Sequence, residues 1–79
     1  MFNFIKPFSE KCKTIGGDDV NKTCIFPFID KNGIEFTTCK KQSDGFVCST
    51  LVDETGAHVY GQGKWGYCGP NCPMPRTKC

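Results

Sequence analysis

The fold is decided by the stretch Cys24-Ile-Phe-Pro-Phe-Ile-Asp-Lys-Asn-Gly-Ile-Glu-Phe-Thr-Thr-Cys39. Residues 24–29 are mainly apolar and residues 34–38 alternate apolar and polar, and the Asn32-Gly33 pair between them favours a turn with positive φ. Pro27 has no N–H to donate to a neighbouring strand, so its strand lies at an edge or is bulged there. We therefore predict a β-hairpin over residues 24–38.

The number of cysteines is the second decisive feature, because the chain has seven of them in 79 residues and only 38% hydrophobic residues. Such a chain forms one domain at most, and its core alone rarely contributes more than about 3–5 kcal/mol. Each disulfide typically adds about 2–4 kcal/mol. Disulfides persist in oxidising compartments, so we expect a secreted, extracellular protein.

The remaining chain indicates more short strands and long loops. A second hairpin is predicted from Val52 to Trp65, with a turn at residues 54–57. Frequent glycines after residue 55 disfavour helix. We expect a small disulfide-rich, mostly β fold with two short antiparallel hairpins or sheets, large loops and little or no helix. It comprises an N-terminal arm (1–11), a body (12–72) and a basic, proline-rich tail (73–79).

Several classes of function are disfavoured. Residues 1–8 contain Asn3, Lys6 and Pro7, which interrupt any signal-peptide core, and no segment is long and apolar enough to span a membrane. A net charge of +2 is too small to indicate nucleic acid as a partner. Only Cys68 and Cys72 have the close spacing of zinc ligands, so we expect no metal site and no cofactor.

No catalytic set is evident, and we expect that the protein is not an enzyme. A Ser–His–Asp arrangement would need His58 beside Ser43 or Ser49 together with a carboxylate such as Asp53, and no local motif orients them. A cysteine nucleophile would need a reduced thiol, which the extracellular setting disfavours. His58 is expected to be a solvated loop residue rather than a pH switch.

Three motifs are spaced along residues 24–68. The first is Cys24-Ile-Phe-Pro-Phe28, followed by an aromatic, Phe36, before Cys39. The second is a short polar loop before Cys48-Ser-Thr50, and the third is Gly63-Lys-Trp-Gly-Tyr-Cys68. In these motifs the segment resembles a fibronectin type II module, a small kringle-like disulfide-rich module.

The resemblance implies a disulfide pairing that spacing alone leaves open. In that family the first of the four cysteines pairs with the third and the second pairs with the fourth. Here this implies Cys24–Cys48 and Cys39–Cys68. Cys12 and Cys72 then flank the module, and we expect a Cys12–Cys72 bridge between its ends. Extra flanking cysteines of this kind look like forms of the module in arthropod secreted proteins. Cys79 is left unpaired, or it bonds to a partner chain or a second copy.

The resemblance also implies a shallow aromatic patch that binds gelatin, collagen segments or choline headgroups in family members. Phe36, Trp65 and Tyr67 match positions of that patch, and Tyr60 lies in a longer loop that adds to it. Phe26 and Phe28 are expected in the core. The chain departs from the family where Asp30 and Val47 replace aromatic residues.

We therefore expect a non-catalytic binding module for an extracellular protein, glycan or lipid headgroup. One alternative is a toxin, defence peptide or protease inhibitor that presents Arg76. Another is a non-catalytic part of a larger secreted protein, such as a protease zymogen, linked through Cys79. Asn21-Lys-Thr23 is an N-glycosylation sequon, which would mark a surface loop of a glycoprotein.

Overall fold

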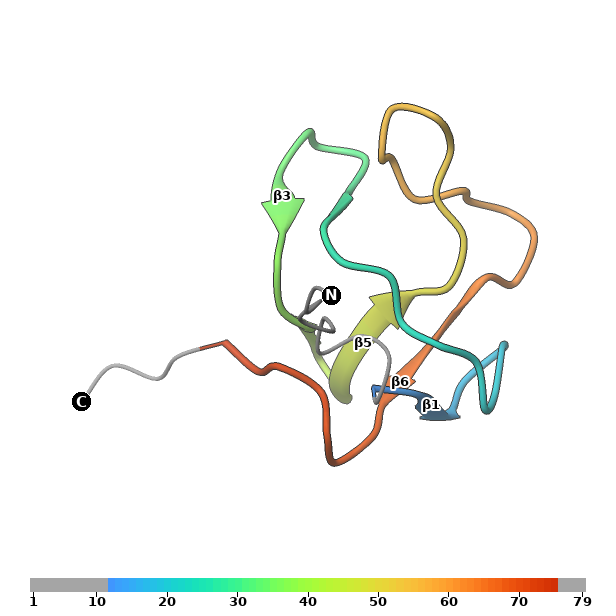
Figure 1. The fold of residues 1–79 in the computed structure, drawn as a ribbon, viewed down its shortest axis with the longest axis vertical. Helices are drawn as coiled ribbons and strands as arrows, with labels where there is room; N and C mark the ends of the chain where they lie inside the picture. The colour runs from blue at the N-terminus through green and yellow to red at the C-terminus, as the bar shows by residue number, and fades with distance from the viewer. Residues whose placement is uncertain (1–11, 76–79) are drawn as a thin grey trace, which may run out of the picture.

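The computed structural model describes residues 12–75, so the N-terminal arm, Arg76 and Cys79 lie outside the described residues. Residues 12–75 contain no helix and form two antiparallel sheets (Figure 1). The prediction of a small, mostly β, disulfide-rich fold is therefore confirmed. The strands are β1 (Thr14–Gly16), β2 (Phe28–Ile29), β3 (Glu35–Phe36), β4 (Lys40–Gln42), β5 (Gly45–Ser49) and β6 (Trp65–Cys68).

The larger sheet has the strand order β1-β6-β5-β4, with every neighbouring pair antiparallel. Strand β6 comes from the end of the body and lies between β1 and β5, so distant parts of the chain meet there. Strands β4 and β5 form a tight hairpin in which Lys41 faces Phe46. This hairpin was not predicted from the sequence, although the polar Ser43-Asp44-Gly45 turn was a signal for it.

The smaller sheet is the predicted hairpin, shortened to two residues in each strand. Gly33 N donates to Asp30 O at 2.9 Å, and Gly33 itself has a φ of 81°. Residues 31–33 thus make a three-residue loop that ends in a left-handed residue, a common hairpin connection. Pro27 follows a cis peptide bond and lies immediately before β2, outside the ladder.

The second predicted hairpin, from Val52 to Trp65, is wrong in its extent. A turn does form, since Gly56 N donates to Asp53 O at 2.9 Å, but only one antiparallel bridge follows it, between Val52 and His58. Trp65 belongs to β6, which pairs with β1 and β5 instead. Gly61 and Gly63 have positive φ, which interrupts an extended strand and leaves residues 59–64 as loop.

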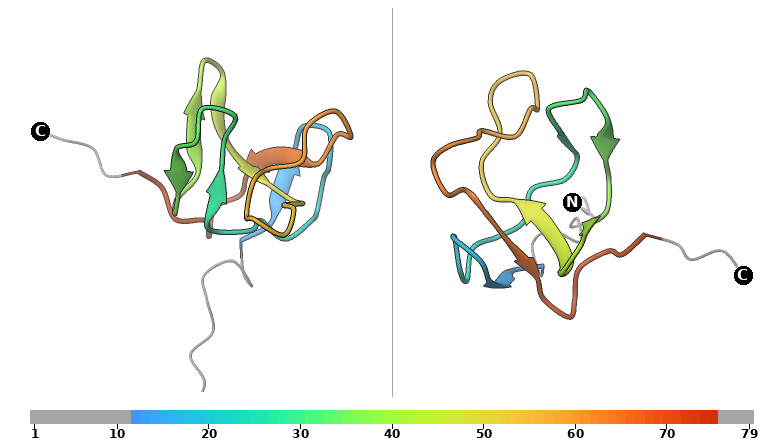
Figure 2. Two further views of the ribbon diagram at one scale, coloured as in Figure 1. Left: turned by 90° about the horizontal axis from the view of Figure 1, so that it is seen from above. Right: turned by 180° about the vertical axis from the view of Figure 1, so that it is seen from behind.

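The loop between β5 and β6 and the β2–β3 hairpin extend next to each other from the larger sheet (Figures 1 and 2). His58 N donates to Ile29 O at 2.9 Å, and Ile29 also makes a parallel bridge to Ala57. The hairpin and the loop therefore form one continuous wall beside the sheet.

Three disulfides form the centre of the core, and they are the same three pairs that the sequence analysis expected: Cys12–Cys72, Cys24–Cys48 and Cys39–Cys68. The Sγ atoms of Cys12, Cys24, Cys68 and Cys72 all lie within 4.8 Å of one another. Phe28 is buried against this cluster, as predicted, whereas Phe26 is only partly buried. Within residues 12–75 no helix is long and apolar enough to cross a membrane.

Candidate functional site

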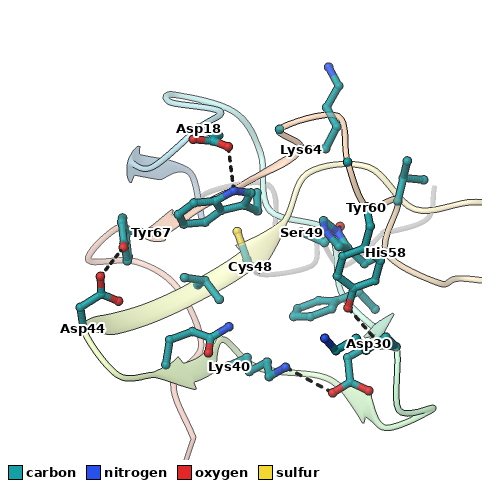
Figure 3. Close-up of a pocket in the computed structure, with 18 of the residues that line it drawn as sticks. Asp18, Asp30, Lys40, Asp44, Cys48, Ser49, His58, Tyr60, Lys64 and Tyr67 are labelled. Atoms are coloured by element: carbon teal, nitrogen blue, oxygen red, sulfur yellow. Dashed lines mark hydrogen bonds and ion pairs between the residues drawn. The ribbon is translucent and has the colours of Figure 1, made fainter.

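A cleft of about 810 Å³ opens over one face of the larger sheet (Figure 3). Side chains alternate between the two faces of a strand. On β6, Trp65 and Tyr67 face the cleft, whereas Gly66 and Cys68 lie on the other face and are buried. Val47 and Ser49 stand opposite Tyr67 and Trp65 on β5, so these four residues form the floor.

The two aromatic rings of the floor pack edge to face, with centroids 5.2 Å apart and an interplanar angle of 79°. Each ring is fixed by a carboxylate at its polar end. Trp65 Nε1 donates to Asp18 Oδ2 at 3.0 Å, and Tyr67 Oη donates to Asp44 Oδ2 at 2.8 Å (Figure 3). These bonds hold both rings in place while part of each ring surface stays accessible.

The same carboxylates affect the acidity of Tyr67. Its hydrogen bond to Asp44 raises the pKa of the phenol, and burial and the negative charges of Asp44 and Asp18 raise it further. Both carboxylates therefore contribute negative potential at one end of the cleft.

Glycines allow the backbone to pack directly on these rings. A Cβ atom at Gly17 would lie 2.9 Å from Trp65 Cζ3 and equally close to the Cα of Gly66, and the φ of Gly17 is 89°. At Gly45 a Cβ atom would lie 3.2 Å from Tyr67 Cδ1. Bulkier residues at either position would displace the rings.

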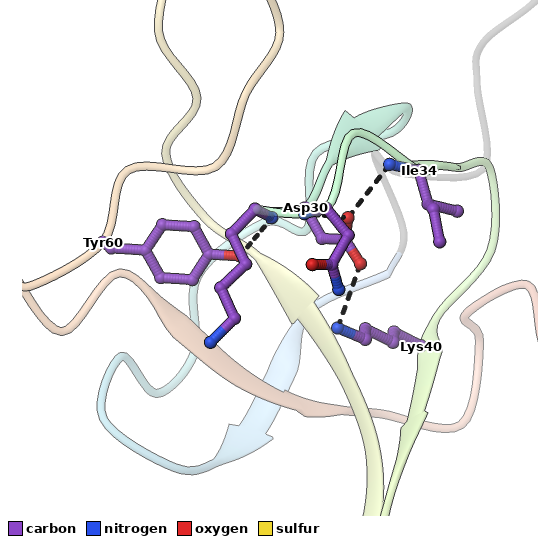
Figure 4. Close-up of polar contacts among 6 residues, drawn as sticks. Asp30, Ile34, Lys40 and Tyr60 are labelled. Carbon is purple, nitrogen blue, oxygen red and sulfur yellow. Dashed lines mark hydrogen bonds and ion pairs between the residues drawn. The ribbon is translucent and has the colours of Figure 1, made fainter.

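Tyr60 stands on the opposite wall and is 53% exposed. Its hydroxyl accepts a hydrogen bond from Lys31 N at 3.0 Å (Figure 4), and its ring meets the His58 ring edge to face at 4.5 Å. Tyr60 thus attaches the long loop to the turn of the β2–β3 hairpin.

Asp30, where the resemblance leads one to expect an aromatic residue, supports that turn instead. Its Oδ1 accepts hydrogen bonds from Asn32 N at 2.9 Å and Ile34 N at 3.0 Å, and its Oδ2 pairs with Lys40 Nζ at 3.3 Å (Figure 4). The bond from Ile34 is the main cause that lowers the pKa of this carboxyl group, and Asn32 and Lys40 lower it further against the opposing effect of burial. Asp30 therefore stabilises the turn as a carboxylate, and the charge of Lys40 balances its charge at this end of the cleft.

His58 is half-buried, so the expectation of a solvated loop residue is wrong. Its Nδ1 lies 2.6 Å from Ser49 Oγ, and burial lowers the pKa of the imidazole, with the charge of Lys40 adding to this. The Ser49 side chain is 1% exposed, and Asp53 accepts hydrogen bonds from Thr55 and Ala57. Among residues 12–75, Ser49 and His58 therefore join β5 to the loop, and Asp53 makes its hydrogen bonds within its own turn and none to His58.

The structure brings three of the four proposed ligand-binding residues, Tyr60, Trp65 and Tyr67, into one cleft. The fourth, Phe36, is not among the lining residues and stacks on Phe28 with centroids 5.4 Å apart. Asp18 and Asp44 were not predicted as site residues, because nothing in their local sequence shows that they accept hydrogen bonds from rings on β6.

Asn21, the sequon residue, lies in an exposed turn after β1 and has a φ of 62°. Its backbone N–H donates to Thr14 O at 2.9 Å, which fixes the turn and leaves the residue exposed.

The site is therefore an open cleft with a fixed aromatic floor in a small, disulfide-rich, mostly β domain. Comparisons of this chain with protein-family models, with curated proteins and with solved structures give no match.

Proposed function

We propose that the protein is a secreted, non-catalytic binding module of the fibronectin type II kind, and that it holds its ligand in the aromatic cleft. The observation that carries the proposal is the fixed Trp65–Tyr67 pair on the cleft floor. The disulfide pairs Cys24–Cys48 and Cys39–Cys68, which the resemblance implies, support the family assignment. Several disulfides in one small domain are typical of extracellular proteins.

Binding is favoured because little conformational freedom remains to be lost. Aromatic rings offer large apolar contact areas with few rotatable bonds, and they are enriched among residues that dominate binding energy. Here the hydrogen bonds that the two rings donate to Asp18 and Asp44 already hold them, and three disulfides hold the backbone. Such preorganisation lowers the entropic cost of association.

Trp65 is the only tryptophan, so its fluorescence reports directly on the cleft. We expect a saturable change in emission when the oxidised full-length chain is titrated with one of three probe classes: collagen peptides, glycans or phospholipid vesicles. Tyr60→Ala should weaken that binding, whereas Ile34→Ala should not, because Ile34 is equally exposed but does not line the cleft. No response to any class, with disulfides intact, would reject the proposal.

Secretion and the state of the chain ends are separate parts of the proposal. We expect natural material to lose mass on enzymatic removal of N-glycans, with Asn21 converted to Asp.

Non-reducing electrophoresis would show a larger species if Cys79 joins a partner chain or a second copy. Inhibition of a trypsin-like protease that depends on Arg76 would favour the inhibitor alternative instead.

A further inference from the structure

One end of the cleft carries unbalanced negative charge. The only ion pair among residues 12–75 is Lys40–Asp30, which neutralises the end near Tyr60. Asp18 and Asp44 stand at the other end and take part in no ion pair within the described residues. Each carboxylate contacts one ring of the Trp65–Tyr67 pair, and Figure 3 shows Asp18 and Asp44 on separate segments of the chain.

Both carboxylates retain an oxygen for a ligand. Asp18 and Asp44 each use Oδ2 to accept a hydrogen bond from a ring, and their Oδ1 atoms accept none from residues 12–75. Lys64 also lines the cleft, but among residues 12–75 it forms no ion pair with Asp18 or Asp44. A cationic group seated on the rings would therefore meet carboxylate oxygens without a competing ammonium between them.

We propose that this acidic end of the cleft, formed by Asp18, Asp44, Trp65 and Tyr67, binds the side chain of an arginine carried by a peptide or protein ligand. This inference rests on the proposed function, since it assigns the ligand class of the same cleft. A guanidinium group is planar and carries five N–H donors. It stacks on an aromatic face and donates to carboxylates at its edge, which matches the groups present here.

Two other cationic groups, a quaternary ammonium and the lysine side chain, fit the site less well. A quaternary ammonium group would interact with the ring faces but would leave the Oδ1 atoms of Asp18 and Asp44 without a partner from the ligand. Lysine supplies donors but has no flat face to stack on Trp65. The combination of rings and carboxylates therefore favours arginine over both.

The test compares acetyl-Gly-Arg-Gly-amide with the same peptide containing citrulline, which has nearly the same shape but no charge. Binding to the oxidised, nitrogen-15-labelled full-length chain is followed through the Trp65 Nε1–H resonance. We expect the arginine peptide to bind at least about tenfold more tightly than the citrulline peptide, and its affinity to fall as salt increases. Tetramethylammonium should bind more weakly than the arginine peptide.

Two charge-removing variants locate the effect. Asp18→Asn and Asp44→Asn should each weaken binding of the arginine peptide by about two- to fivefold, the range for an exposed ion pair. Glu54→Gln makes the same change in net charge but lies outside the cleft, and it should leave the affinity unchanged. An amide side chain still accepts a hydrogen bond, so the rings should keep their positions.

Failure of this inference can be told apart from failure of the proposed function. Equal binding of the arginine and citrulline peptides, or tighter binding of tetramethylammonium that is insensitive to Asp18→Asn, would overturn arginine as the ligand class. In that case a response of Trp65 to other probes would leave the binding module intact. Absence of a Trp65 response to every probe would overturn both.

Discussion

At the scale of single residues, the cleft floor depends on positions that carry no side chain. Trp65 fits into the floor because Gly17, which has no Cβ atom, lies directly against the indole ring. The φ of Gly17 is 89°, and residues with a Cβ atom adopt this backbone conformation only at a cost in free energy. Gly17 thus combines a conformational requirement with a packing requirement.

Gly17→Ala is expected to destabilise the protein by about 1–3 kcal/mol and to shift the emission of Trp65. The added Cβ atom would lie 2.9 Å from both Trp65 Cζ3 and Gly66 Cα, so the ring or the strand must move. Urea unfolding of the oxidised protein measures the stability.

Gly33→Ala is the matched control, because Gly33 also has positive φ but nothing within 4 Å of its added Cβ atom. We expect it to cost about 1 kcal/mol or less and to leave the emission of Trp65 unchanged. Equal effects of the two substitutions would show that contact with Trp65 is unimportant.

At the scale of elements, His58 links the long loop to the sheet and to the hairpin. Its side chain contacts Ser49 on β5, and its backbone N–H donates to Ile29 on β2. Burial and the positive charge of Lys40 disfavour the protonated imidazole. Stability should therefore depend on the protonation of this residue.

The folded protein is expected to lose stability as the pH falls below about 6.5, the ordinary pKa of histidine. The pKa of His58 is lowered by folding, so the unfolded chain binds a proton at a higher pH than the folded chain does. The stabilisation is therefore complete above 6.5 and is lost on acidification towards the folded pKa. Urea midpoints between pH 8 and pH 5 measure this.

His58→Gln should make the midpoint nearly independent of pH over that range. A wild-type midpoint that rises on acidification, or the same pH dependence in the variant, would contradict the assignment to His58.

The elements also show how far sequence reasoning reaches. The hairpin around Asn32-Gly33 was predictable because its turn is encoded locally. The position of β6 between β1 and β5 was not, because it depends on pairing of segments about 50 residues apart, such as Gly16 with Tyr67. Trp65 and Tyr67 were proposed as site residues because the motif in which they stand resembles a known module, whereas their partners Asp18 and Asp44 stand in no such motif and lie 47 and 23 residues away in the chain.

At the scale of the whole molecule, the disulfides replace a conventional hydrophobic core. Among residues 12–75, six of the eight buried hydrophobic residues are disulfide-bonded cysteines: Cys12, Cys24, Cys39, Cys48, Cys68 and Cys72. The Cys12–Cys72 bridge spans a sequence separation of 60 and joins the two ends of the body. It therefore restricts the unfolded chain more than the other bridges do.

Removing the end-to-end bridge with Cys12→Ser and Cys72→Ser is expected to cost about 2–5 kcal/mol. Removing Cys24 and Cys48 in the same way should cost about 1 kcal/mol less through chain entropy, because their sequence separation is 24. Urea unfolding of the two double variants gives the comparison. A larger loss for the shorter loop would show that packing around Cys24–Cys48 outweighs the entropy of the unfolded chain.

Whether the aromatic cleft of the oxidised protein is a binding site is tested by a nitrogen–proton spectrum recorded during titration with the arginine peptide. We expect saturable shifts of the Trp65 Nε1–H and of the backbone N–H of Tyr67 and Asp44, with the backbone N–H of Phe36 unchanged because Phe36 lies outside the cleft. Shifts that centre on Phe36, or no shift at Trp65 with this peptide or any other probe, would contradict it.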